Sequence, residues 1–164
     1  MDDQEEIYIH LANCIDSMNR VWRILNNIRR NKDNPLAGYA FELALIEYSK
    51  PYKDSNSAFR NEKGKPIRKY RLGTEFVPKK YLELHRRILD TRDGFYAHLD
   101  LDIRDAKVYV QKTEYGKNIV RSQNLIDGIE KEKNIEDIVG LVEITLNAMR
   151  EKAKILGDKL PPNL

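Results

Sequence analysis

The sequence predicts an all-α fold, an up-down helical bundle of four main helices with a small β-hairpin before the last helix. Apolar residues recur with helical spacing in four long segments. In addition, 41% of the residues are hydrophobic and 34% are charged, which is typical of a globular protein with an ionised surface. A chain of 164 residues can bury one sizeable core. We therefore expect a single domain over residues 1–164, with a long basic loop at about residues 52–77.

The first predicted helix carries apolar residues at alternating intervals of four and three. This stripe consists of Ile7, Leu11, Cys14, Met18, Val21, Leu25 and Ile28. The spacing places them on one helix face, and Ile15, Trp22 and Ile24 widen that face toward the width found in globular bundles. Cys14 is the single cysteine of the chain, so we expect a packed thiol and no intrachain disulfide.

The second and third predicted helices begin at prolines. Asn34 followed by Pro35 is typical of an N-cap and a first helical position, and Pro51 ends this helix. Its expected buried face consists of Ala37, Ala40, Phe41, Ala44, Leu45 and Tyr48. Pro78 suits the first position of the third helix. The stripe of that helix consists of Leu82, His85, Ile88, Leu89, Arg92, Phe95, Tyr96 and Leu99.

A short hairpin is predicted between the third and the last helix. The alternating segments 108–110 and 119–120 flank the turn-like residues 114–118. Asn134 can cap the last helix, and Gly157 ends it. The stripe of this helix consists of Ile135, Ile138, Val142, Thr145, Met149, Ala153 and Leu156.

Positive charge is concentrated in the long loop. Residues 50–80 contain ten Lys/Arg and three Asp/Glu, a net charge of +7 in a chain whose total is +3. The cations alternate with Tyr52, Phe59 and Tyr70, which is typical of an electrostatic and stacking surface for single-stranded nucleic acid. The candidate binding residues are Arg60, Lys63, Lys65, Arg68, Lys69, Arg71 and Tyr70. A solvated loop without a ligand is the alternative, and the length of the loop predicts either a functional or a partly disordered segment.

One short motif suggests a reaction. The segment Arg92-Asp93-Gly94-Phe95-Tyr96-Ala97-His98 lies late in the third predicted helix. It resembles the motif of the HEPN family of helical-bundle ribonucleases and nucleotide-binding modules, in which an arginine and a polar residue are followed after a few positions by histidine. The resemblance implies metal-independent RNA cleavage, of a defence or toxin-antitoxin type, at a site where two protomers meet. Arg92 and His98 would be the catalytic pair, with Asp93 as the polar follower.

The chemistry is reasonable for these side chains. An imidazole can relay the proton of a ribose 2′-hydroxyl while a guanidinium holds the phosphate through two hydrogen bonds. On a regular helix, residues six apart differ by about 120° in direction, so a distortion at Gly94, the reach of Arg92 or a second protomer must bring the pair together. In the alternative, Arg92 only pairs with Glu42, Glu47 or Asp93, and His98 ends the helix.

Two other functions stay open. One is a non-catalytic module that binds a nucleotide or a protein. The other is a metal-dependent nucleotide pyrophosphohydrolase, since the pairs Asp90/Asp93 and Asp102/Asp105 could each share a helix face, although the chain contains no Glu-x-x-Glu motif. The three histidines and the one cysteine do not form the four-ligand pattern of a structural zinc site, and no glycine-rich phosphate loop is present. We therefore expect no bound metal and no cofactor.

The expected location is the cytoplasm. No apolar run approaches the roughly 18 residues that a bilayer span requires, and the acidic first residues are unlike a secretory signal. The expected partners are RNA or a nucleotide, a second copy of the chain in a homodimer, and in the interaction-module alternative another protein. No membrane partner is expected.

Overall fold

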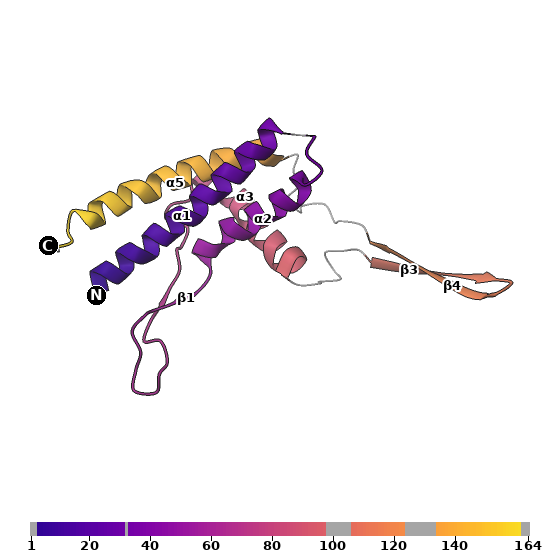
Figure 1. Cartoon of the computed structure of the whole chain (residues 1–164), viewed down its shortest axis with the longest axis horizontal. Coiled ribbons are helices and arrows are strands. Elements are labelled where there is room, and N and C mark those ends of the chain that lie inside the picture. Colours follow the sequence, from indigo (N-terminus) through magenta and orange to yellow (C-terminus); the bar gives the residue numbers. More distant parts are fainter. Residues whose placement is uncertain (1–2, 32, 98–105, 124–133, 162–164) are drawn as a thin grey trace.

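The structure is a computed structural model (Figure 1). It describes residues 3–31, 33–97, 106–123 and 134–161, and for residues 95–97, 106–107 and 120–123 only the backbone. The chain is mostly helical, with a two-stranded hairpin before the last helix, as the sequence predicts. None of the described helices combines the length and the apolar content needed to cross a membrane.

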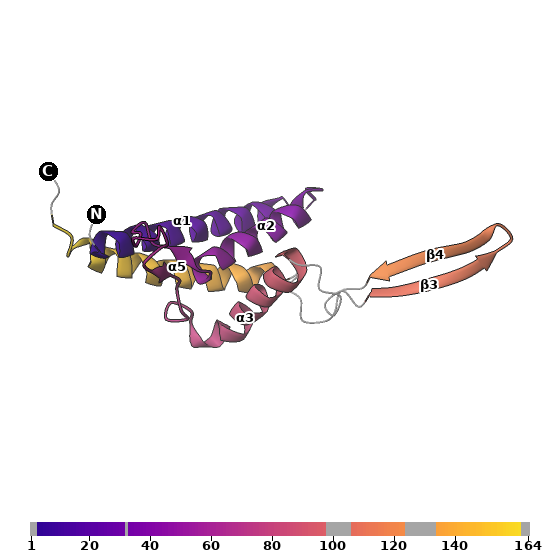
Figure 2. The same ribbon diagram turned by 90° about the horizontal axis from the view of Figure 1, so that it is seen from below.

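Three helices form the main packed unit. Helix α1 (Asp3–Arg30) lies along both α2 (Ala37–Ser49) and α5 (Ile135–Gly157), and both views show α5 beside α1 (Figures 1 and 2). Helices α1 and α5 are antiparallel, because Arg29 bonds Glu136 at 2.9 Å near one end. Further along the two helices, the side-chain oxygen Oδ1 of Asn19 accepts a hydrogen bond from Arg150 at 2.8 Å.

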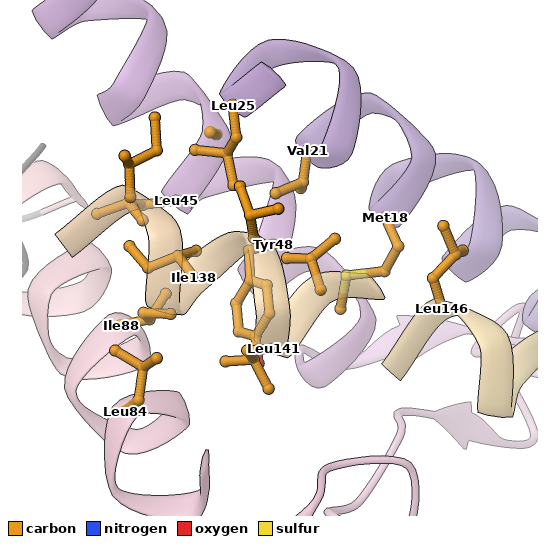
Figure 3. Packing of buried hydrophobic residues seen from close by; sticks show 14 of the residues in the cluster. Met18, Val21, Leu25, Leu45, Tyr48, Leu84, Ile88, Ile138, Leu141 and Leu146 are labelled. Atoms are coloured by element: carbon orange, nitrogen blue, oxygen red, sulfur yellow. The ribbon is translucent and has the colours of Figure 1, made fainter. Parts of the chain in front are cut away.

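The core lies where α1, α2, α5 and the shorter helix α3 (Leu82–Asp90) meet. Figure 3 shows its central side chains, among them Met18, Val21, Leu25, Leu45, Tyr48, Leu84, Ile88, Ile138, Leu141 and Leu146. Burying each aliphatic side chain of this size contributes about 1.5–3 kcal/mol to folding. The predicted stripe of α1 is buried from Leu11 to Ile28. The prediction is wrong for Ile7, which is 41% exposed, because its turn of α1 packs through Glu6 against a polar loop.

Helix α2 begins two residues later than predicted. The Asn34 side chain accepts a hydrogen bond from the Leu36 N–H at 2.9 Å, which forms a turn before the helix starts at Ala37. The predicted apolar face is otherwise confirmed. On it, the Tyr48 hydroxyl lies 2.8 Å from Nδ1 of the buried His85, so this histidine has a structural role in the core.

The third predicted helix is divided into three kinds of helix. A 3-10 turn (Lys79–Tyr81) precedes α3, and a π-helical segment (Thr91–Ala97) follows it. Pro78 therefore precedes a 3-10 turn instead of starting an α-helix. The π-helical segment contains Gly94, so the helix is distorted where a distortion was expected. Such segments are rare in proteins, and those that occur often lie at functional sites.

In the described ranges, two pairs of antiparallel strands accompany the helices. Strands β1 (Ser55–Asn56) and β2 (Lys69–Tyr70) join the two sides of the long basic loop, which had no predicted strands. Strands β3 (Ala106–Thr113) and β4 (Gly116–Gln123) confirm the predicted hairpin and are longer than expected. Both views show this second hairpin extending away from the helices (Figures 1 and 2). Gly116, with φ of +127°, follows its two-residue turn.

A core substitution tests the predicted role of the α1 stripe. The Leu25 side chain is 0% exposed, so Leu25→Ala should lower the free energy of unfolding by about 2–5 kcal/mol. Ile7→Ala removes a side chain of the same class from an exposed position and should cost less than about 1 kcal/mol. Urea unfolding followed by circular dichroism measures both, and equal losses would contradict this assignment of the core.

Candidate nucleic-acid interface

A cleft of about 510 Å³ lies where α1, the end of α2, the β1–β2 loop and Arg92 meet. We call it the α1 cleft. Helix α1 contributes one face to it, formed by Glu6, Ile9, His10, Asn13, Cys14 and Ser17. The other walls consist of Ser49, Lys50, Pro51, Lys53, Asp54, Ser55, Asn56, Ala58, Tyr70 and Arg92. A volume of this size is within the range of small-ligand sites, about 300–1,000 Å³.

The β1–β2 loop is an irregular hairpin. Beyond the two short strands, the Ser57 N–H donates to the Arg68 carbonyl at 3.0 Å, and the Ile67 N–H donates to the Phe59 carbonyl at 3.2 Å. At its turn, the Asn61 side chain accepts from the backbone N–H groups of Lys63 and Lys65, both at 3.0 Å. These bonds give an ordered shape to a segment in which the sequence shows no periodic pattern.

Glu6 attaches this loop to α1. Its carboxylate is buried and accepts from the Ser57 hydroxyl at 2.9 Å, from the Tyr70 hydroxyl at 2.8 Å and from the Ala58 N–H. Burial alone would raise the pKa of Glu6. The hydrogen bonds from Ala58, Tyr70 and Ser57 and the charge of Arg68 outweigh that effect and lower the pKa below its usual value. Glu6 is therefore a carboxylate near neutral pH, and it anchors both sides of the loop.

Three cations line the cleft: Lys50, Lys53 and Arg92. Arg92 bonds Asp93 at 2.7 Å, and Lys53 pairs with the other oxygen of the same carboxylate. Burial would raise the pKa of Asp93, but the hydrogen bonds and charges of Lys53 and Arg92 lower it overall. The Arg92 side chain keeps 30% of its surface exposed. Two cations from distant parts of the sequence are thus held together at the edge of the cleft.

The two carboxylates that line the cleft already have hydrogen-bond donors. Glu6 is held by the loop, and Asp54 bonds Lys69 at 2.9 Å. Of the three cations, Lys50 pairs with Glu47, whereas Lys53 and Arg92 share the single carboxylate of Asp93. The second pairing leaves one positive charge in excess, which favours an anionic ligand that brings its own acceptor oxygens, such as a phosphate.

His10 and Cys14 lie one helical turn apart on the α1 side of the cleft. His10 Nε2 lies 3.6 Å from Cys14 Sγ, and the His10 ring stacks on Tyr70 with centroids 5.4 Å apart. Burial lowers the pKa of His10, so its ring is neutral near pH 7. Burial also raises the pKa of Cys14 to about 11, which keeps the thiol protonated and argues against a thiolate nucleophile.

The predicted catalytic residues are only partly placed. Arg92 lines the cleft, and Asp93 pairs with it, as one of the alternatives for Arg92 expected. Neither Glu42 nor Glu47 forms that pair, and Glu47 instead bonds Arg20 at 3.1 Å. His98 lies outside the described residues, so its relation to Arg92 stays a prediction.

Three of the cations predicted to bind nucleic acid already bond other residues of the protein. Arg68 pairs with Asp3 at 2.7 Å, Lys69 pairs with Asp54, and Arg60 donates to the carbonyl of Ser57. The side chains of Lys63, Lys65 and Arg71 are exposed.

Among the aromatic residues of the loop, Tyr70 lines the cleft. The prediction that Tyr52 belongs to a stacking surface is wrong. Tyr52 is buried in the core, 4.5 Å from the ring of His85 between centroids.

The prediction missed two central residues of the cleft, Glu6 and His10. A signal for them exists, because Glu6, His10, Asn13 and Ser17 follow one another at intervals of four, three and four. This spacing forms a polar stripe on α1 beside the apolar one. The partners of Glu6 lie more than fifty residues away and have no periodic pattern.

The metal-dependent alternative gains no support from the described part of the chain, in which no three His, Cys, Asp or Glu side chains gather as metal ligands. Asp102 and Asp105 lie outside the described residues. Comparisons with protein-family models, curated proteins and solved structures gave no significant match to this chain. The functional interpretation therefore depends on the geometry of the cleft.

The Glu6 anchor predicts a pH-dependent loop. The pKa of Glu6 is lowered in the folded state. Its contribution to the stability of the loop on α1 is therefore complete above the ordinary carboxyl pKa of about 4.5, and it is lost as pH falls through the lower folded-state pKa. Glu6→Gln should release the β1–β2 loop from α1 in the same way at neutral pH. The protection factors of the backbone amides of residues 57–59, which are corrected for the intrinsic exchange rate at each pH, should fall in both cases, while those in the core of α5 are unchanged at neutral pH.

Glu62→Gln at the exposed turn of the loop is the matched control and should leave this exchange unchanged. Unchanged exchange in Glu6→Gln would contradict the anchoring role.

Proposed function

We propose that this chain binds single-stranded RNA, with a backbone phosphate held in the α1 cleft by Arg92 and Lys53. The observation that carries the proposal is the meeting of these two cations at the edge of the α1 cleft. A guanidinium can bind two phosphate oxygens at once, and an ammonium adds a second positive charge nearby. Asp93 orients both side chains in the free protein through its two carboxylate oxygens.

The exposed cations of the β1–β2 loop support the same proposal. Lys63, Lys65 and Arg71 extend the positive charge beyond the cleft along the loop. A nucleic acid strand carries one phosphate for each nucleotide, so a strand that enters the cleft can contact these side chains with its neighbouring phosphates. The cleft would fix the position of the strand, and the loop would add affinity.

RNA cleavage is the further step that the HEPN resemblance implies. In this proposal the chain is an up-down helical bundle that forms a cytoplasmic homodimer, and Arg92 and His98 act together without a metal ion. His98 would relay the proton of a ribose 2′-hydroxyl, and Arg92 would stabilise the charge on the phosphate. A defence or toxin-antitoxin setting is part of the same proposal. Binding without cleavage would favour the non-catalytic module.

Arg92→Ala tests the phosphate contact. It should weaken binding of a labelled single-stranded oligoribonucleotide about tenfold or more, since hydrogen bonds to charged groups contribute about 1.5–3 kcal/mol. It should also reduce the slope of log affinity against log salt concentration by about one, which is the contribution of one lost phosphate contact. Fluorescence anisotropy at several salt concentrations measures both effects.

Arg23→Ala is the matched control, because Arg23 is an exposed arginine on α1 that lines a different cavity. Equal effects of the two variants would contradict a specific site at Arg92. If the wild type cleaves RNA, cleavage should persist in a chelator and be lost in both Arg92→Ala and His98→Ala. Cleavage that disappears with the chelator would favour the metal-dependent alternative instead.

A further inference from the structure

The proposed phosphate contact with Arg92 and Lys53 does not use the pair of stacked rings in the α1 cleft. His10 comes from α1 and Tyr70 from β2, and their planes are 30° apart. Both side chains are half-buried and line the same cavity as Arg92 and Lys53. Two flat rings beside a cationic group offer the combination of surfaces that a nucleotide presents to a protein, a base and a phosphate.

Each ring is held in its orientation by a hydrogen-bond partner. The Tyr70 hydroxyl donates to Glu6 at 2.8 Å, and His10 Nε2 is engaged with Cys14 Sγ at 3.6 Å. A ring that is fixed before the ligand arrives loses little conformational entropy on binding. Because the two rings stack on each other with centroids 5.4 Å apart, a base would stack on an outer face of this preorganised pair.

The rest of the lining suits the edge of a base. Asn13 and Asn56 bring amide groups into the wall of the cleft, whereas the hydroxyls of Ser17 and Ser49 already bond Arg20 and the Ile46 carbonyl. Amides both donate and accept hydrogen bonds, as the edges of nucleobases require. The cavity of about 510 Å³ is large enough for a ligand of this kind.

We propose that the α1 cleft is a site for one nucleotide, whose base stacks on the His10–Tyr70 pair and whose phosphate is bound by Lys53 and Arg92. The proposal extends the proposed RNA binding, from which it takes the phosphate contact, and it names the ligand as a single unpaired nucleotide. A free nucleoside 5′-monophosphate should therefore bind as well. A base that is paired in a duplex cannot enter the cleft, so the site selects single strands.

Isothermal titration of the full chain tests this site with three probes: adenosine 5′-monophosphate, ribose 5-phosphate and inorganic phosphate. Stacking of one base typically changes affinity by about 5- to 100-fold, so the nucleotide should bind more tightly than ribose 5-phosphate by a factor in that range. Arg92→Ala should weaken the binding of all three probes.

Substitutions of His10 separate stacking from charge. His10→Ala should weaken binding of the nucleotide about fivefold or more and leave inorganic phosphate unaffected. His10→Phe keeps a flat ring and should restore most of the nucleotide affinity. Circular dichroism of each variant checks that the helices are intact. If a variant is not folded, the comparison of the three probes on the wild type decides between stacking and charge.

The outcomes distinguish the two proposals. Equal binding of the nucleotide and ribose 5-phosphate, with no effect of His10→Ala, would overturn the base site even if RNA binds through Arg92. Nucleotide binding that depends on His10, in a chain that binds no RNA, would support the site and contradict the proposed function. A wild type that binds none of the three probes would overturn the site.

Discussion

The carboxylate of Glu6 holds two unlike parts of the molecule together. On one side is α1, a helix of 28 residues whose apolar face is packed in the core. On the other side is the β1–β2 loop, which contributes only a few buried side chains and is held mainly by polar contacts. Hydroxyl groups of Ser57 and Tyr70 and the N–H of Ala58 converge on this one buried carboxylate. Without it, Tyr70 has no fixed place beside His10, and the α1 cleft lacks one wall.

The cleft also depends on α1 having two different faces. Its apolar stripe binds α1 to α2 and α5, and its neighbouring polar stripe lines the cleft. A rigid helix thus positions His10 and Glu6, while the π-helical segment after α3 brings Arg92 to the opposite side. Lys53, which follows α2 in the chain, lies beside Arg92 because both side chains pair with Asp93. One packed core thus positions side chains from four separate parts of the chain around the α1 cleft.

The sequence predicted the parts of the structure that have a repeating pattern. The apolar spacing identified α1, α2 and α5, and alternation identified the β3–β4 hairpin. It failed at Ile7, whose turn of α1 packs through Glu6 against the polar β1–β2 loop, and at Tyr52, whose neighbours in the loop concealed its place in the core. Of the residues that line the cleft, Arg92 and Tyr70 were predicted as site residues, and Asp93, which pairs with Arg92, was predicted beside them. Its anchor could not be predicted, because the contact between Glu6 and Ser57 joins residues 51 positions apart through side chains that no periodic pattern marks.

In the proposed function, RNA enters the α1 cleft and meets the rings of His10 and Tyr70. The most direct measurement is photo-crosslinking of the full chain to a short single-stranded oligoribonucleotide that contains 4-thiouridine, followed by mass spectrometry of the crosslinked peptides. This account predicts crosslinks in the peptides that contain His10 and Tyr70. Crosslinks confined to the exposed Trp22 on the other side of α1, or to Tyr115 at the tip of the β3–β4 hairpin, would contradict it.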